Sequence, residues 1–155
     1  MTGHPTSRRR LATSYDDADS SPGLLLWQVT NRWQAAIRAA LKQHGLTHVQ
    51  FVLLASLTWL DVDDELVTQR RLADHAATDP MMTSQVVRVL ARRGLVERRE
   101  HPEDARAKWL VVTPEGAALA NRTVGVVEAV DREFFGRLGT TEAAFARALG
   151  LLAAT

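Results

Sequence analysis

The chain has 155 residues, a formal net charge of +1 from 19 basic and 18 acidic side chains, and no cysteine. Its length is typical of one domain, and the lack of cysteine excludes disulfides, thiolate metal sites and cysteine-based redox sensing. No apolar run is long enough to span a bilayer, so we expect a soluble, cytoplasmic protein.

Residues 1–21 are predicted to form a disordered arm, because Thr, Ser and Asp are frequent there and the charges cancel. Residues 22–155 are predicted to form a single domain. Its first helix, at about 22–43, follows a Ser-Pro pair that is typical of a helix start. Gly45 is expected to end this helix.

A second helix is expected after Thr47, which is a typical N-cap residue. Apolar or small residues then recur at the spacing of one helical face. The members of this stripe are Val49, Val52, Leu53, Ser56, Leu57 and Leu60. Thr68 is expected to cap a short third helix that turns Leu72, Ala73 and Ala76 inward.

The fourth helix has the clearest boundaries, because Asp79 and Pro80 are typical of a helix start and Gly94 of a helix end. At about 100° per residue, its side chains divide into two faces. The predicted apolar face contains Met82, Val86, Val89 and Leu90, and the opposite face contains Met81, Ser84, Gln85, Arg88 and Arg92. A short helix, a turn and a helix with such a polar face indicate a helix-turn-helix, although an ordinary solvated face has the same pattern.

Two short extended runs, GLVERR and KWLVVT, flank a turn-like segment from His101 to Asp104. This pattern predicts a β-hairpin with a projecting tip that carries Arg106. A helix-turn-helix followed by a hairpin is a winged helix-turn-helix, here at about 47–113. The predicted fold class is therefore mainly α with a small β-hairpin wing (α+β).

The segment ADHAATDPMMTSQVVRVLARRGLVERREHPEDARAKWLVVTPEG resembles the DNA-binding core of the multiple antibiotic resistance regulator (MarR) family. The most specific pieces are Asp104-Ala105-Arg106, Arg-Gly-Leu-Val at 93–96 and Thr-Pro-Glu-Gly at 113–116. The resemblance extends from about residue 22 to residue 153. It implies a sequence-specific regulator of transcription that binds a palindromic operator as a homodimer, and a ligand-responsive repressor in particular.

The resemblance also implies roles for single residues. In such proteins the recognition helix enters the major groove, a wing arginine reaches the minor groove, and a wing aspartate holds the loop. The implied DNA-binding residues are Thr83, Ser84, Gln85, Arg88, Arg92, Asp104, Arg106 and Lys108. The chain departs from the family at Arg88 and Val89, where many relatives carry an acidic and then a basic residue, so the resemblance does not predict the base preference.

The distribution of charge supports the same assignment without reference to the family. Residues 66–113 carry nine basic and six acidic side chains, a net charge of +3, which leaves −2 for the remainder. Basic charge is therefore concentrated in the segment that is predicted to meet phosphate. The excess is modest and would not be sufficient alone.

Apolar residues recur in the helices at both ends of the chain, and we expect the helices at about 22–43 and 114–153 to form a dimer. Dimerisation supplies a second half-site about one helical turn of DNA away. The alternative is that these helices pack onto their own domain. A second alternative for the whole chain is an architectural or protein-interaction module without sequence preference.

The remaining chemistry concerns small ligands. In the resembling family, small aromatic effectors bind between the dimerisation helices and the DNA-reading part. Candidate residues for such a pocket are Trp27, Trp33, Trp59 and His48, although packing is the more common role of tryptophan. No metal site, cofactor or catalytic motif is recognisable, so we do not expect an enzyme.

Overall fold

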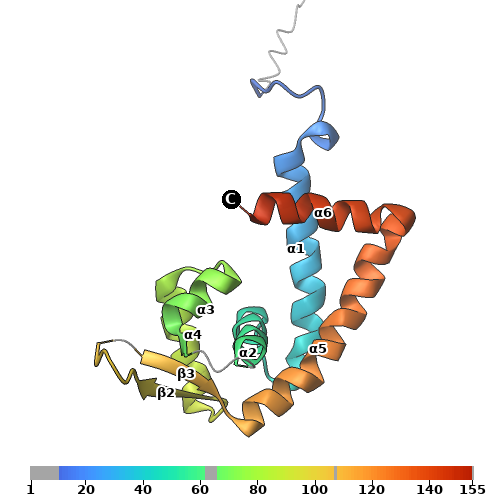
Figure 1. The fold of residues 1–155 in the computed structure, drawn as a ribbon. Helices are drawn as coiled ribbons and strands as arrows, with labels where there is room; N and C mark the ends of the chain where they lie inside the picture. The colour runs from blue at the N-terminus through green and yellow to red at the C-terminus, as the bar shows by residue number, and fades with distance from the viewer. Residues whose placement is uncertain (1–10, 62–65, 107, 155) are drawn as a thin grey trace, which may run out of the picture. The chain divides into compact units, whose positions relative to one another are not determined.

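The structure, a computed structural model, describes residues 11–61, 66–106 and 108–154. The chain divides into two units, residues 1–33 and 34–155, and each is described by itself. Helices dominate the described residues, and a three-stranded antiparallel sheet accompanies them (Figure 1). The predicted fold class is confirmed.

The first unit contains the predicted arm and the start of helix α1, Pro22–Leu41. Residues 1–10 of the arm lie outside the described residues. Within the rest of the arm, Ala18–Ser20 forms a 3₁₀ turn that the Asp17 side chain caps. The predicted start of α1 is confirmed, since the Ser21 hydroxyl accepts a hydrogen bond from a backbone N–H of its first turn at 3.4 Å.

A tight turn leads from α1 into the next helix. The 3₁₀ segment Lys42–His44 ends at Gly45, whose φ of 65° lies in the left-handed region that favours glycine. Helix α2, His48–Leu60, then begins at the predicted cap. The Thr47 hydroxyl accepts the Gln50 N–H at 3.2 Å, and the Gln50 side chain accepts the Thr47 N–H at 3.1 Å. This reciprocal pair is a capping box.

Two short helices form the helix-turn-helix. Helix α3, Gln69–Ala76, is capped by Thr68, and helix α4, Pro80–Arg92, is capped by Asp79, as predicted. Three residues connect the helices, and Ala77 among them has a left-handed φ of 50°. The turn therefore has the length that the helix-turn-helix arrangement requires.

The predicted hairpin is present and extends into a sheet. Strand β2, Val96–Glu100, pairs antiparallel with β3, Lys108–Val112, and β1, Val67–Thr68, pairs with the other edge of β3. Leu110 in the central strand is fully buried and lies between the two partner strands. The sequence analysis did not predict β1, because a two-residue strand has no pattern of its own.

The chain ends in two further helices. Helix α5, Pro114–Phe135, is capped by Thr113 as predicted, and a 3₁₀ segment, Gly136–Thr141, leads into helix α6, Glu142–Ala153. Gly139 interrupts the helical geometry with a φ of 54°. This bend requires a glycine-like backbone and separates α5 from α6.

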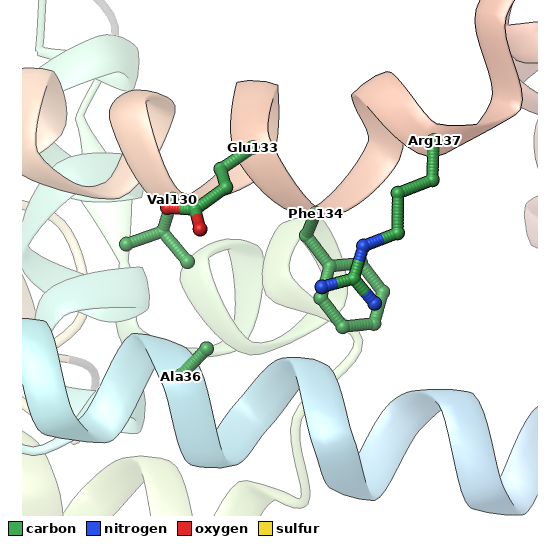
Figure 2. Close-up of a pocket in the computed structure, with 5 residues that line it drawn as sticks. All are labelled: Ala36, Val130, Glu133, Phe134 and Arg137. Carbon is green, nitrogen blue, oxygen red and sulfur yellow. The ribbon is translucent and has the colours of Figure 1, made fainter.

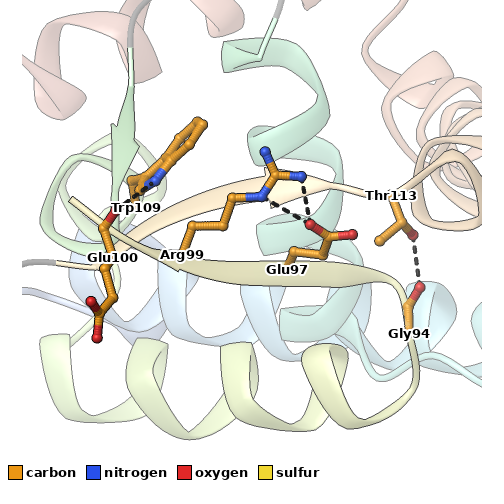
Figure 3. Close-up of polar contacts among 6 residues, drawn as sticks. All are labelled: Gly94, Glu97, Arg99, Glu100, Trp109 and Thr113. Atoms are coloured by element: carbon orange, nitrogen blue, oxygen red, sulfur yellow. Dashed lines mark hydrogen bonds and ion pairs between the residues drawn. The ribbon is translucent and has the colours of Figure 1, made fainter. Parts of the chain in front are cut away.

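The first turn of α5 is locked to the base of the wing. The Thr113 hydroxyl donates to the Gly94 carbonyl oxygen at 2.7 Å (Figure 3) and accepts the Gly116 N–H at 3.0 Å. The Thr113 N–H donates to the Leu95 carbonyl oxygen at 3.1 Å. A Cβ on Gly116 would overlap that oxygen and lie 2.9 Å from the Leu95 carbonyl carbon. The Thr-Pro-Glu-Gly motif is therefore a structural joint.

Helix α2 forms the centre of the second unit, because it contacts α3, α4, α5 and β3. Neighbours on several sides bury Phe51 and Leu54 as well as the predicted Leu53 and Leu57. The other members of the predicted stripe, Val49, Val52, Ser56 and Leu60, are only half-buried. The prediction of one apolar stripe was partly wrong, because a central helix is packed over more of its circumference than a surface helix.

Candidate DNA-binding interface

Helix α4 has a packed face and an exposed face. Thr83, Val87 and Leu90 are almost completely buried, whereas Met82, which was predicted to pack, is 43% exposed. The face that was predicted to pack is therefore rotated about the helix axis, by part of a turn, from the face that is buried in the structure. The opposite face is exposed except for the half-buried Ser84, and is called the reading face below. Its members are Met81, Ser84, Gln85, Arg88 and Arg92.

The prediction that Thr83 contacts DNA is wrong. Its side chain has an exposed fraction of 0%. Its hydroxyl donates to the Asp79 carbonyl oxygen at 2.8 Å and lies 2.7 Å from the Thr78 hydroxyl. A hydroxyl that is buried and satisfied in this way holds the turn between α3 and α4 to the helix, and it cannot reach a base edge.

The tip of the wing is organised by Asp104. One of its carboxylate oxygens accepts the backbone N–H of Arg106 at 3.0 Å. Next to it, the His101 ring nitrogen Nδ1 accepts the Glu103 N–H at 3.2 Å. Asp104 thus fixes the backbone on which the exposed Arg106 side chain stands. The family resemblance implied that Asp104 holds the wing loop, and in the structure its carboxylate does so by a hydrogen bond to the main chain.

Two cations of the wing are held by acidic side chains. The Arg99 guanidinium contacts a Glu97 carboxylate oxygen at 2.6 Å and lies 5.4 Å from the centre of the Trp109 ring (Figure 3). The Trp109 ring N–H donates to the Glu100 carbonyl oxygen at 3.1 Å, which fixes the ring across the hairpin. Lys108 contacts the Glu100 carboxylate at 3.3 Å, so this predicted DNA contact is partly neutralised within the wing.

Four other cations, on α4 and the wing, have no acidic side chain in contact, as far as the described residues go. They are Arg88 and Arg92 on the reading face, Arg106 at the wing tip and Arg98 on β2. The sequence analysis did not include Arg98 among the candidate DNA contacts. Strand alternation could not have found it, because alternation places Arg99 on one face with Glu97 and Arg98 on the other face with Glu100. The structure shows that Glu97 contacts Arg99, whereas Glu100 contacts Lys108. Uncompensated cations attract phosphate more strongly than paired ones.

Arg93 has a structural contact instead. Its guanidinium donates to the Gly45 carbonyl oxygen at 2.8 Å and to the Gln50 side-chain oxygen at 3.3 Å. The end of α4 is thereby joined to the turn that precedes α2. This contact fixes where the recognition helix ends relative to the start of the central helix.

A cavity lies beside Trp59, one of the candidate ligand residues. Its volume is about 430 Å³, and α2 and α5 supply its lining: Ala55, Thr58, Trp59, Ala120, Asn121 and Val124. Trp59 is 77% exposed, so packing within the chain does not account for this large apolar side chain. The volume falls within the range of small-molecule sites, about 300–1,000 Å³.

The other candidate ligand residues are not placed in this cavity. His48 is half-buried at the start of α2, and its pKa is lowered by burial and by the nearby Arg38, which Asp131 opposes. Trp27 and Trp33 belong to the first unit. Trp27 is exposed and Trp33 is half-buried. The predicted grouping of all four residues stays a prediction.

A second, smaller cavity lies between α1 and α5. Its volume is about 240 Å³, below the usual range for small-molecule sites. Figure 2 shows Ala36 facing Val130, with the Arg137 guanidinium over the Phe134 ring at 5.9 Å from its centre. The Trp59 cavity is therefore the better candidate for a ligand.

A recognition helix with an exposed polar face, followed by a wing that carries uncompensated arginines, defines a winged helix-turn-helix protein that binds DNA. The sequence model of the MarR family matches residues 46–108. The HTH-type transcriptional regulator YdcH of Bacillus subtilis is 41% identical over 123 residues, which cover 79% of this chain and 84% of YdcH.

Two further proteins extend the comparison. The HTH-type transcriptional repressor Rv2887 of Mycobacterium tuberculosis is 34% identical over 122 residues, 78% of this chain and 85% of that protein. A structure of Bordetella bronchiseptica BpsR, whose DNA binding is regulated by 6-hydroxynicotinic acid, is 25% identical with a TM-score of 0.80 over 90% of this chain and 97% of BpsR. The chain belongs to the MarR family and is a DNA-binding regulator of transcription.

Two other features were searched for in the described ranges. None of the helices there is both long and apolar enough to cross a membrane. The same ranges hold no group of three or more His, Asp or Glu side chains that could bind a metal ion.

Proposed function

We propose that the protein is a homodimeric repressor that binds a two-fold symmetric operator and releases it when a small aromatic effector binds. The observation that carries the proposal is the exposed reading face of α4 beside a wing with uncompensated arginines. The repressor relative Rv2887 supports the direction of regulation. BpsR supports control of DNA binding by an aromatic acid.

The proposed DNA-binding residues form three groups, according to the part of the DNA that each group would contact. Ser84, Gln85 and Arg88 would contact base edges in the major groove, where hydrogen-bond donors and acceptors differ for each base pair. Arg92 and Lys108 would contact phosphates. Arg106, on the backbone that Asp104 braces, would enter the minor groove, whose negative potential attracts guanidinium groups.

Exposed apolar helix surfaces support the homodimer. Within the first unit, the start of α1 exposes four large apolar side chains: Leu24, Leu25, Leu26 and Trp27. Within the second unit, α6 exposes Leu149, Leu151 and Leu152. Large apolar side chains that are exposed in such numbers mark a surface that another protein covers. A second copy of the chain would cover it and would supply the second recognition helix.

Selection of bound duplexes from random DNA tests this function. We expect enrichment of a two-fold symmetric motif whose half-sites are about one helical turn apart. Light scattering on the free protein should give twice the mass of one chain. A motif without symmetry, or a monomeric protein, would contradict the proposal. Retention of DNA without any enriched motif would favour an architectural binder.

The effector is expected to bind beside Trp59 and to lower operator affinity. A bound effector would favour a spacing of the two recognition helices that does not match successive major grooves. Thermodynamic linkage then requires the operator to lower effector affinity by the same factor, about 5- to 150-fold for typical couplings. The Trp59 indole, 77% exposed at the cavity, provides the fluorescence signal.

The experiment titrates aromatic acids, including 6-hydroxynicotinic acid, and phenols into the protein with and without operator. A Trp59→Phe variant identifies the contribution of this indole to the signal. Asn121→Ala, at the rim of the same cavity, should weaken effector binding while operator affinity without effector stays unchanged. Equal effector affinity in the presence and absence of operator would refute the coupling, even if the effector binds.

A further inference from the structure

Met81 is the apolar residue of the reading face, whose other members are polar. It is the second residue of α4, and 71% of its surface is exposed. The packing of α4 is complete without it, because Val87 and Leu90 form the buried face. Packing within the chain therefore does not explain a large apolar side chain at this position.

The backbone at this position is held rigidly. One carboxylate oxygen of Asp79 accepts the N–H groups of both Met81 and Met82 at 2.9 Å. This cap fixes the direction in which each side chain leaves the helix. Met81 therefore has a defined starting point, while its three flexible side-chain bonds allow it to adapt to a surface.

Met81 lies on the same stripe of α4 as the residues that are proposed to contact bases. At about 100° per residue, it is separated from Ser84, Gln85 and Arg88 by about 20–60° around the helix axis. Met82 is rotated by about 100° from Met81. Residues at the N-terminal end of a recognition helix are those that reach the base edges.

We propose that Met81 is a specificity-determining residue that recognises the 5-methyl group of a thymine in the operator. The inference rests on the proposed function, in which α4 enters the major groove. The thioether offers only a weak acceptor, so Met81 is poorly suited to read the hydrogen-bonding pattern of a base pair. The thymine methyl group is the apolar feature of the major groove, and apolar side chains recognise it by contact.

The test removes that methyl group alone. The operator obtained by selection is synthesised with single thymines replaced by deoxyuridine, symmetrically in both half-sites. For the wild-type protein, one such replacement should weaken binding about fourfold for each half-site, the effect of exposing one buried methyl group. For Met81→Ala, the thymine operator should bind more weakly and that replacement should have no further effect. The coupling between the two changes measures their contact.

Two variants complete the design. Met81→Leu keeps an apolar side chain and should retain the preference for thymine over uracil. Met82→Ala removes the neighbouring exposed methionine and should leave the preference unchanged. Because Met81 is exposed, its variants should unfold at the temperature of the wild-type protein, which separates recognition from folding.

The outcomes distinguish this inference from the proposed function. If a motif is enriched but Met81→Ala shows the same thymine dependence as the wild type at every position, only the inference fails. If Met82→Ala instead loses the dependence, the methyl contact exists but the assignment to Met81 is wrong. If selection enriches no motif, the proposed function fails and the inference fails with it.

Discussion

Arg106→Ala is expected to weaken binding to cognate and scrambled DNA alike. It should also reduce the slope of log affinity against log salt by about one unit for each subunit, since a cation that displaces a counterion is lost. Arg106 is exposed, its backbone is fixed by Asp104, and no acidic side chain among the described residues contacts its guanidinium. The measurement is operator titration at several salt concentrations.

Arg99→Ala is the matched control on the same wing. It changes the net charge by the same amount, but it removes a guanidinium that Glu97 and Trp109 already hold. We therefore expect a smaller change in the salt slope. If both variants change the slope equally, long-range charge explains the effect and Arg106 has no direct contact with DNA.

Arg88→Ala gives the contrasting pattern. A major-groove contact carries sequence information, so its loss should cost about 1–3 kcal/mol at the cognate site. Affinity for scrambled DNA should change much less, and the preference at one or two positions should relax. A uniform loss across all sequences would instead assign Arg88 to a phosphate.

Gly116→Ala is expected to destabilise the protein by about 3 kcal/mol or more, the upper range of overpacking effects. The added Cβ would overlap the Leu95 carbonyl oxygen, and relief would require movement of backbone. That oxygen also accepts the Thr113 N–H, so the movement would disturb the joint between α5 and the wing. Chemical denaturation at one fixed protein concentration measures the loss, since the stability of a dimer depends on concentration.

Gly125→Ala is the control within the same helix. No atom lies within 4 Å of the Cβ that it would add, and Gly125 is exposed in α5. Alanine there should stabilise the helix by about 1 kcal/mol, because glycine is a poor helix former. A Gly116→Ala protein as stable as the wild type would show that the close approach to Leu95 is relieved without cost.

Helix boundaries and the wing tip could be predicted from the sequence because their causes are local. The caps at Thr47, Thr68, Asp79 and Thr113 each bond to a backbone N–H two or three residues further on. The brace at Asp104 likewise reaches only two residues. Such signals depend only on the type of a residue and on neighbours a few positions away, and both can be read directly from the sequence. The family resemblance then implied what a helix-turn-helix with a wing does.

Burial required the tertiary structure, because helical spacing identifies an apolar face only to within part of a turn. Thr83, which was predicted to contact DNA, is buried, and Met82, which was predicted to pack, is exposed, since the neighbours of α4 decide which side of the helix is covered. The Thr83 side chain can be buried because residues of the turn before α4 form hydrogen bonds with its hydroxyl. Amino-acid composition and residue spacing do not predict this hydrogen bonding of the Thr83 hydroxyl.

Long-range contacts were also decided by the fold alone. Strand β1 exists because β3 offers it an edge, and Arg93 reaches Gly45 across 48 residues of sequence. The choice between Arg98 and Arg99 as the uncompensated cation depends on the neighbours that each face of the hairpin provides. The sequence by itself determined the helices, the hairpin and the class of protein, whereas packing and pairing between distant segments decided the third strand and which side chains remain available to DNA.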